Sequence, residues 1–178
     1  MDMIVTATSG AGKKVLDITR VKPGCVITDV ARPLDLPASE VAKRPDVLVI
    51  ESGEILLPGK PRMKNIGLPP GVAYACLAET IVLALEGRFE NFTAGRHIER
   101  EKVKEIYRLF RRHRFEIAPL RTFGELLTDG MIAEKRARAE ELLRDPKLLK
   151  RVKAEAAAKM AKIPPRAKGV AGVTTLKG

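Results

Sequence analysis

Cysteine, histidine and aromatic residues are scarce in this sequence. Its 178 residues include two cysteines, two histidines, two tyrosines, five phenylalanines and no tryptophan. Cys25 and Cys76 are too few for a disulfide framework and lack metal-ligand spacing, so the sequence predicts no metal site and favours a reducing cytoplasm. With aromatic residues at only 4%, base-stacking surfaces are also lacking, which argues against nucleic-acid binding.

Long hydrophobic runs are absent as well. The longest nearly apolar stretch, 72–85, is interrupted by Glu79 and Thr80 and is shorter than the roughly 20 residues that cross a bilayer, so no membrane span is expected. A composition of 45% hydrophobic and 31% charged residues is typical of a folded, water-soluble protein. Of the net charge of +11, residues 121–178 carry +7, from 14 Lys and Arg against 7 Asp and Glu. This basic extension either binds an acidic partner or is simply a solvated helical surface.

Three short apolar runs, at 3–9, 25–30 and 46–50, are typical of buried parallel strands. We therefore expect an α/β fold. Because ligands of such sheets bind beyond the carboxyl ends of the strands, the candidate cofactor-binding residues are those at these ends. They are Thr6, Thr8, Ser9, Asp29 and Gly53, and we expect the last four to lie along one crevice. Asp29 is either a carboxylate that faces a ligand or the cap of the next turn.

Helical patterns follow the strands. Residues 73–86 and 99–114 carry apolar side chains at helical spacing, and a helix-forming segment rich in Ala, Lys, Glu and Arg runs from about 132 to 161, with a break or new start at Asp145-Pro146. The sequence thus predicts three parts: a partial Rossmann-like domain at 1–72, a helical part at 73–120 and a basic helical extension at 121–178.

Cys76 opens the first helical run, directly behind Pro69, Pro70 and Gly71. The first turn of a helix has N–H groups without intrahelical partners and a partial positive charge, and both favour a reactive thiolate. Cys76 is therefore a candidate nucleophile. The alternative is a small apolar residue buried in the core, which is common for free cysteines.

Two further side chains are candidates for proton transfer to or from such a thiol. Glu79 follows Cys76 by three residues and therefore lies near it on one helical face, although its charge opposes a thiolate. A general base would be Glu79 or one of the histidines, of which His113 is the candidate. The predicted catalytic residues are thus Cys76, Glu79 and His113.

Several motifs agree in order and spacing with one known family. They are Ala75-Cys76-Leu77-Ala78-Glu79, Leu85-Glu86-Gly87, Asn91-Phe92-Thr93, Gly95-Arg96 and Arg112-His113-Arg114-Phe115. Over roughly residues 1–120 the chain resembles the C-terminal part of the fatty-aldehyde-forming long-chain acyl-(acyl-carrier-protein) reductases. The strand-end motifs also resemble the NADP-binding domains of shikimate dehydrogenase and glutamyl-tRNA reductase.

The resemblance implies an oxidoreductase in which Cys76 takes an acyl group from a thioester and NADPH reduces it to an aldehyde. It implies NADP as cofactor, an acyl thioester as substrate and an acyl carrier protein as a candidate partner. The dinucleotide fingerprint is missing, so we expect a fragment: the C-terminal half of a Rossmann-like parallel sheet, packing helices and a basic helical tail. The alternatives are a shikimate-dehydrogenase-like reductase with direct hydride transfer and a non-catalytic binding module. An incomplete sheet would expose a strand edge and favour a homo-oligomer.

Overall fold

The computed structural model describes residues 2–8, 15–59, 61–64, 66–95 and 97–162. Its contacts divide the chain into two compact units: the first unit combines 1–52 with 120–178, and the second is Gly53–Pro119. This division differs from the predicted segments 1–72, 73–120 and 121–178. Strand pairing explains the difference, because residues just after 53 pair within the second unit and residues just after 120 return to the first.

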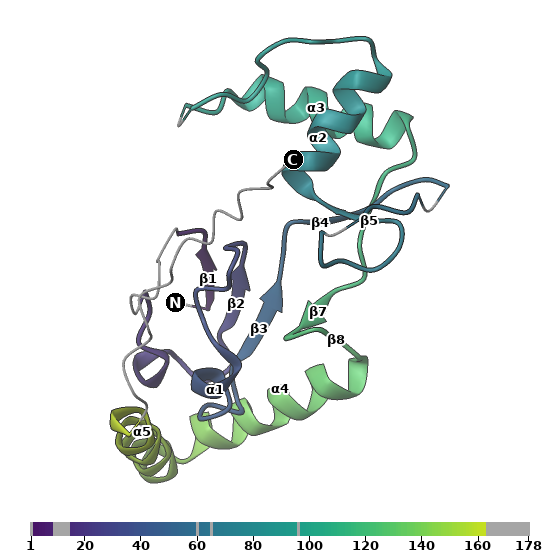
Figure 1. Ribbon diagram of the computed structural model, residues 1–178. Coiled ribbons are helices and arrows are strands. Elements are labelled where there is room, and N and C mark those ends of the chain that lie inside the picture. The colour runs from purple at the N-terminus through teal and green to yellow at the C-terminus, as the bar shows by residue number, and fades with distance from the viewer. Residues whose placement is uncertain (1, 9–14, 60, 65, 96, 163–178) are drawn as a thin grey trace, which may run out of the picture. The chain divides into compact units, whose positions relative to one another are not determined.

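The first unit is built on a five-stranded sheet with the order β1-β2-β3-β7-β8. The strands are β1 (Met3–Thr6), β2 (Val26–Asp29), β3 (Leu48–Glu51), β7 (Arg121–Thr122) and β8 (Glu125–Leu126). The first three strands are parallel and lie side by side in Figure 1. Their last residues, Thr6, Asp29 and Glu51, are in register with one another. The α/β fold and the three parallel strands are confirmed. The sheet is mixed, however, because β7 pairs with β3 in the antiparallel direction.

Among the described residues, the first unit also contains four helices. They are the 3₁₀ helix η1 (Ile18–Arg20), α1 (Ala38–Val41), α4 (Asp129–Arg144) and α5 (Pro146–Ala161). One core cluster holds Ile18, Ile27, Leu36 and Val49, which come from η1, two strands and a loop. The predicted new start at Asp145-Pro146 is confirmed, since the Asp145 carboxylate caps α5 by accepting the N–H groups of its first turn.

A buried ion pair fastens η1 to the turn that precedes β3. Arg44 and Asp46 have fully buried side chains and form two hydrogen bonds, from Nε to Oδ1 at 2.9 Å and from Nη2 to Oδ2 at 2.6 Å. The remaining nitrogen of the guanidinium, Nη1, donates to the carbonyl oxygens of Ile18, Thr19 and Val21. Burial of two charges is tolerated here because their hydrogen-bonding groups are engaged.

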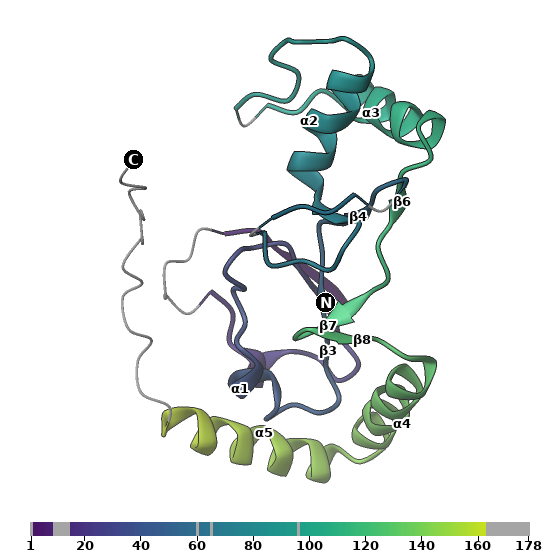
Figure 2. The ribbon, with the colours of Figure 1, turned by 45° about the vertical axis from the view of Figure 1, so that its right-hand side comes forward.

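The second unit packs two helices on a small antiparallel sheet with the order β5-β4-β6. Its elements are β4 (Glu54–Leu56), β5 (Val72–Tyr74), α2 (Ala75–Leu85), α3 (Arg100–Arg112) and β6 (Glu116–Ile117). Figure 2 shows α2 and α3 side by side next to these strands. The core includes Ala78, Val82 and Phe115, and the Phe115 ring stacks on Phe110 with centroids 5.0 Å apart. Both predicted helices are confirmed.

Among the residues that the structure describes, no helix is both long and apolar enough to cross a bilayer.

Candidate functional site

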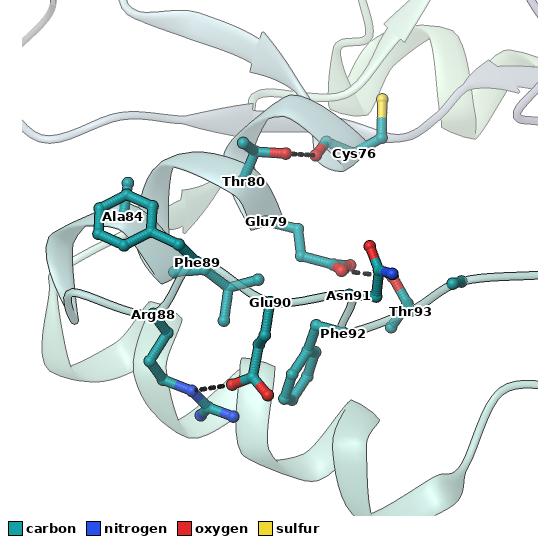
Figure 3. Close-up of a pocket in the computed structure, with 12 residues that line it drawn as sticks. Cys76, Glu79, Thr80, Ala84, Arg88, Phe89, Glu90, Asn91, Phe92 and Thr93 are labelled. Carbon is teal, nitrogen blue, oxygen red and sulfur yellow. Dashed lines mark hydrogen bonds and ion pairs between the residues drawn. The ribbon is translucent and has the colours of Figure 1, made fainter.

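A groove of about 830 Å³ runs along α2 in the second unit. It is formed by one face of α2 and by the segment 88–94 that follows the helix (Figure 3). Its lining mixes apolar and polar side chains: Cys76, Glu79, Thr80, Leu83, Ala84, Arg88, Phe89, Glu90, Asn91, Phe92, Thr93 and Ala94. The groove has the size of a small-molecule site, and its polar groups could orient a bound compound.

Cys76 lies at the end of this groove, in the first turn of α2. Its side chain is exposed, so the alternative interpretation as a buried core residue is excluded. Tyr74 precedes the helix without making a side-chain capping bond, and the N–H of Ala75 donates to the carbonyl oxygen of Gly53 at 2.8 Å. Since first-turn N–H groups have no partner within a helix, this position can stabilise negative charge that develops next to the sulfur.

Glu79 lines the same groove but is engaged with the loop. Its carboxylate accepts a hydrogen bond from the Thr93 hydroxyl, and Figure 3 shows this carboxylate and the Cys76 sulfur pointing in different directions. The hydroxyl of Thr80 donates to the Cys76 carbonyl oxygen at 3.2 Å, one turn along the helix. Glu79 therefore fixes the loop that forms one wall of the groove, rather than contacting the thiol.

The third predicted catalytic residue, His113, lies elsewhere in the second unit. Its Nε2 contacts the carboxylate of Glu86, which also accepts a hydrogen bond from Arg112 at 3.2 Å. Glu86 caps the C-terminal end of α2 and follows Cys76 by ten residues. In a helix, this separation corresponds to about 15 Å along the axis. The structure thus brings Cys76 and Glu79 together in one groove and places His113 at the opposite end of the helix.

The Glu86–His113 contact predicts a specific loss of stability in acid. The hydrogen bond from His113 holds the pKa of Glu86 below its usual 4.5, against an opposing effect of burial. A carboxyl whose pKa is lower in the folded state stabilises the fold above its ordinary pKa, and this contribution is lost as the pH falls through the folded pKa. In urea titrations at about pH 5, the free energy of unfolding should be larger for wild type than for Glu86→Gln. This difference in free energy should shrink as the pH is lowered toward about 3. A difference that does not change over this range would contradict the assignment.

The predicted cofactor-binding residues of the first unit make internal contacts. Asp29 is fully buried, and its carboxylate accepts the N–H groups of Ala31 at 3.1 Å and Leu36 at 3.0 Å. Thr8 donates its N–H and its hydroxyl to the carboxylate of Asp35, at 3.1 and 2.7 Å. These contacts agree with the alternative in which Asp29 caps the turn after its strand, and they hold the loop beyond the sheet in place.

The other three residues of that set are Thr6, Gly53 and Ser9. Thr6 is buried at the end of β1, with no hydrogen-bond partner for its hydroxyl among the described residues. Gly53 has a φ of 78°, which favours glycine, and belongs to the second unit, where its carbonyl oxygen helps to fix the start of α2. Ser9 lies outside the described residues.

Sequence reasoning missed the role of the loop that closes the groove. Phe92 is buried, and the cationic groups of Arg88 and Lys102 lie 4.8 and 5.5 Å from its ring centroid. Arg88 also donates hydrogen bonds to the carboxylates of Glu105 and Glu90. These hydrogen bonds raise the pKa of Arg88, and the one to Glu105 has the larger effect. The only sequence signal was the triplet Asn91-Phe92-Thr93, which carried a resemblance but no structural prediction.

Comparison with known proteins shows a similarity to an aminotransferase. The chain is 37% identical over 126 residues to the aminotransferase PigE of Serratia sp. (strain ATCC 39006). The match covers 69% of this chain but only 14% of the length of that relative. A scan of family models found no match.

This similarity corrects several predictions. The resemblance to acyl-(acyl-carrier-protein) reductases is wrong, and so are the NADPH-dependent oxidoreductase function, its shikimate-dehydrogenase-like and binding-module alternatives, and NADP as cofactor, since the named relative is an aminotransferase. The physical reason lies in the motifs, because polar residues at strand ends occur in many α/β sheets. Here one of them, Asp29, is occupied by backbone N–H groups.

Proposed function

We propose that this chain is part of an enzyme related to aminotransferases and that its second unit binds a carbonyl compound covalently through Cys76. The observation that carries the proposal is an exposed thiol in the first turn of α2, at the end of a groove of about 830 Å³. The similarity to an aminotransferase supports the ligand class, because transamination converts a carbonyl group into an amine. Three neighbouring parallel strands support a Rossmann-like first unit as the scaffold.

Aminotransferases use pyridoxal phosphate, held as a Schiff base on a lysine with an acidic partner for the ring nitrogen. The groove beside Cys76 is lined by no lysine. A second cavity, in the first unit, is lined by Lys135 and Asp46, among others. Lys135 donates there to the carbonyl oxygens of Pro45 and Val47, and both Asp46 oxygens bind Arg44. Lys22 and Asp2 also line this cavity, and they form an ion pair with each other. Neither place fits the cofactor. We therefore assign to this chain a role in binding the substrate rather than in binding pyridoxal phosphate.

The chemistry proposed for Cys76 is addition of sulfur to a carbonyl carbon. A carbon–sulfur bond forms, the carbonyl π bond breaks, and the oxygen takes up a proton. With an aldehyde the product is a hemithioacetal. With a thioester, used only as a chemical probe of the thiol, the tetrahedral adduct expels the original thiol and leaves an acyl group on Cys76. The first-turn N–H groups of α2 are placed to stabilise the oxygen as negative charge develops on it.

The proposal is tested by mapping covalent adducts. The whole chain is incubated with an octanoyl thioester of N-acetylcysteamine, and the acylated peptide is identified by mass spectrometry. In a parallel reaction, octanal competes with alkylation by iodoacetamide, and octanol, which has no carbonyl group, is the matched control. We expect acylation of Cys76 and protection of Cys76 by octanal only. Equal acylation of Cys25, or no acylation and no protection, would contradict the proposal.

A further inference from the structure

The side chains that line the groove along α2 carry a net negative charge. Of the lining residues that the structure describes, the charged ones are Glu79, Arg88 and Glu90. The guanidinium of Arg88 is already engaged, because its Nε donates to Glu90 at 2.6 Å and its Nη1 donates to Glu105 of α3. Figure 3 shows the pair of Arg88 and Glu90 beside the groove. The guanidinium is therefore already compensated by two carboxylates before any ligand binds.

Glu79 differs from Glu90 in the group that binds its carboxylate. Glu90 is paired with the cation of Arg88. Glu79 instead accepts a hydrogen bond from the hydroxyl of Thr93, which is neutral, so this contact fixes the carboxylate without cancelling its charge. The Glu79 side chain is also partly buried, and charges that are partly shielded from water interact more strongly than exposed charges. The groove thus has a fixed negative charge at Glu79.

Glu79 also lies where the chain of a captured compound would pass. Cys76 is in the first turn of α2, and Glu79 is one turn further along the same face of the helix. Side chains at this spacing have Cβ atoms about 5–6 Å apart. The groove continues from there to Leu83 and Ala84. A compound that is bonded to the Cys76 sulfur and extends along the groove therefore brings the next few atoms of its chain beside the Glu79 carboxylate.

We propose that Glu79 is a specificity-determining residue, which excludes carbonyl compounds that carry a carboxylate a few bonds away from the carbonyl carbon. This inference rests on the proposed capture by Cys76 and adds the class of compound: aldehydes and ketones whose chain is uncharged or cationic. A carboxylate on the chain would face the carboxylate of Glu79, while the guanidinium that lines the groove is already engaged. Selectivity then arises from repulsion of the wrong ligand, and an uncharged chain of the same length meets no such repulsion.

Two probes that differ in charge test the proposal. They are the adipoyl monothioester of N-acetylcysteamine, which ends in a carboxylate, and its methyl ester, which is neutral. In each reaction the Cys76 sulfur bonds to the thioester carbonyl carbon, and N-acetylcysteamine leaves as the free thiol. The rate of acylation of Cys76 in the whole chain is measured by mass spectrometry and divided by the rate with free cysteine, which corrects for the intrinsic reactivity of each probe. We expect the methyl ester to react faster by at least about fivefold.

Glu79→Gln removes the charge but keeps an amide oxygen that can accept the hydrogen bond from Thr93. In this variant the two corrected rates should agree within about twofold. In wild type, salt at about 1 M should reduce the preference, because the screening length falls to about 3 Å. Glu101→Gln is the matched control, since Glu101 is an exposed carboxylate of α3 that pairs with Lys104 at 2.7 Å. It should keep the wild-type preference.

The outcomes separate this inference from the proposed function. If the methyl ester acylates wild-type Cys76 but the charged probe reacts equally fast, the role of Glu79 is overturned and the proposed function stands. A preference that persists in Glu79→Gln, shown to be folded by circular dichroism, would overturn the role of Glu79 in the same way. If neither probe acylates Cys76, the proposed function fails and this inference fails with it.

Discussion

Replacing Asp46 with alanine is expected to lower the free energy of unfolding by about 3–5 kcal/mol. The Arg44 and Asp46 side chains are fully buried, and Asp46 accepts two hydrogen bonds from the guanidinium. Without the carboxylate, a buried positive charge keeps only its bonds to three carbonyl oxygens of the η1 region. An unpaired buried charge costs far more than an exposed ion pair contributes.

Urea denaturation followed by circular dichroism measures this effect. The matched control is Arg144→Ala, which removes an exposed ion pair with Glu140 at 3.2 Å and should cost less than about 1 kcal/mol. Equal losses for Asp46→Ala and Arg144→Ala would show that the buried pair does not hold η1 against the turn before β3.

Replacing Cys76 with serine is expected to slow covalent capture of a carbonyl compound by at least about 100-fold, because a serine hydroxyl is far less nucleophilic than a thiol. The melting temperature should stay close to that of wild type, since the Cys76 side chain is exposed. The rate of acylation by the octanoyl thioester and thermal unfolding are the two measurements.

Cys25→Ser provides the opposite control. Cys25 is fully buried in the core of the first unit, and burial raises the pKa of its thiol, which disfavours the reactive thiolate. Cys25→Ser should therefore be acylated at Cys76 as fast as wild type but be less stable, because it buries a hydroxyl among apolar side chains. Capture at the wild-type rate by Cys76→Ser would remove the thiol from the mechanism.

The fold was predictable where the signal is local. Continuous apolar runs predicted β1, β2 and β3, and helical spacing predicted α2 and α3. The strands β4, β5 and β6 have two or three residues each, too few for a period to appear, and depend on pairing between residues far apart in the chain. The units could not be predicted for the same reason, because long-range pairing places Gly53–Pro119 apart from the segments on either side of it.

The candidate site was predictable in part. The position of Cys76 follows from the Pro-Pro-Gly sequence ahead of an apolar helix, and Glu79 follows from helical spacing. The direction of the Glu79 carboxylate depends on Thr93, and the position of His113 depends on how α3 packs beside α2. Such contacts between elements leave no pattern in the sequence, which is why His113 could be named as a base although it lies at the other end of α2.

The central claim is that Cys76 adds to a carbonyl carbon, and carbon-13 NMR of octanal labelled at that carbon tests it most directly. With wild-type protein we predict a new resonance in the tetrahedral region, characteristic of a carbon bonded to sulfur and oxygen. This resonance should be absent with Cys76→Ser and retained with Cys25→Ser. The aldehyde hydrate, whose labelled carbon bears two oxygens, is identified from a sample without protein. Absence of the sulfur-bonded resonance with the folded wild-type protein, or its persistence with Cys76→Ser, would contradict the account.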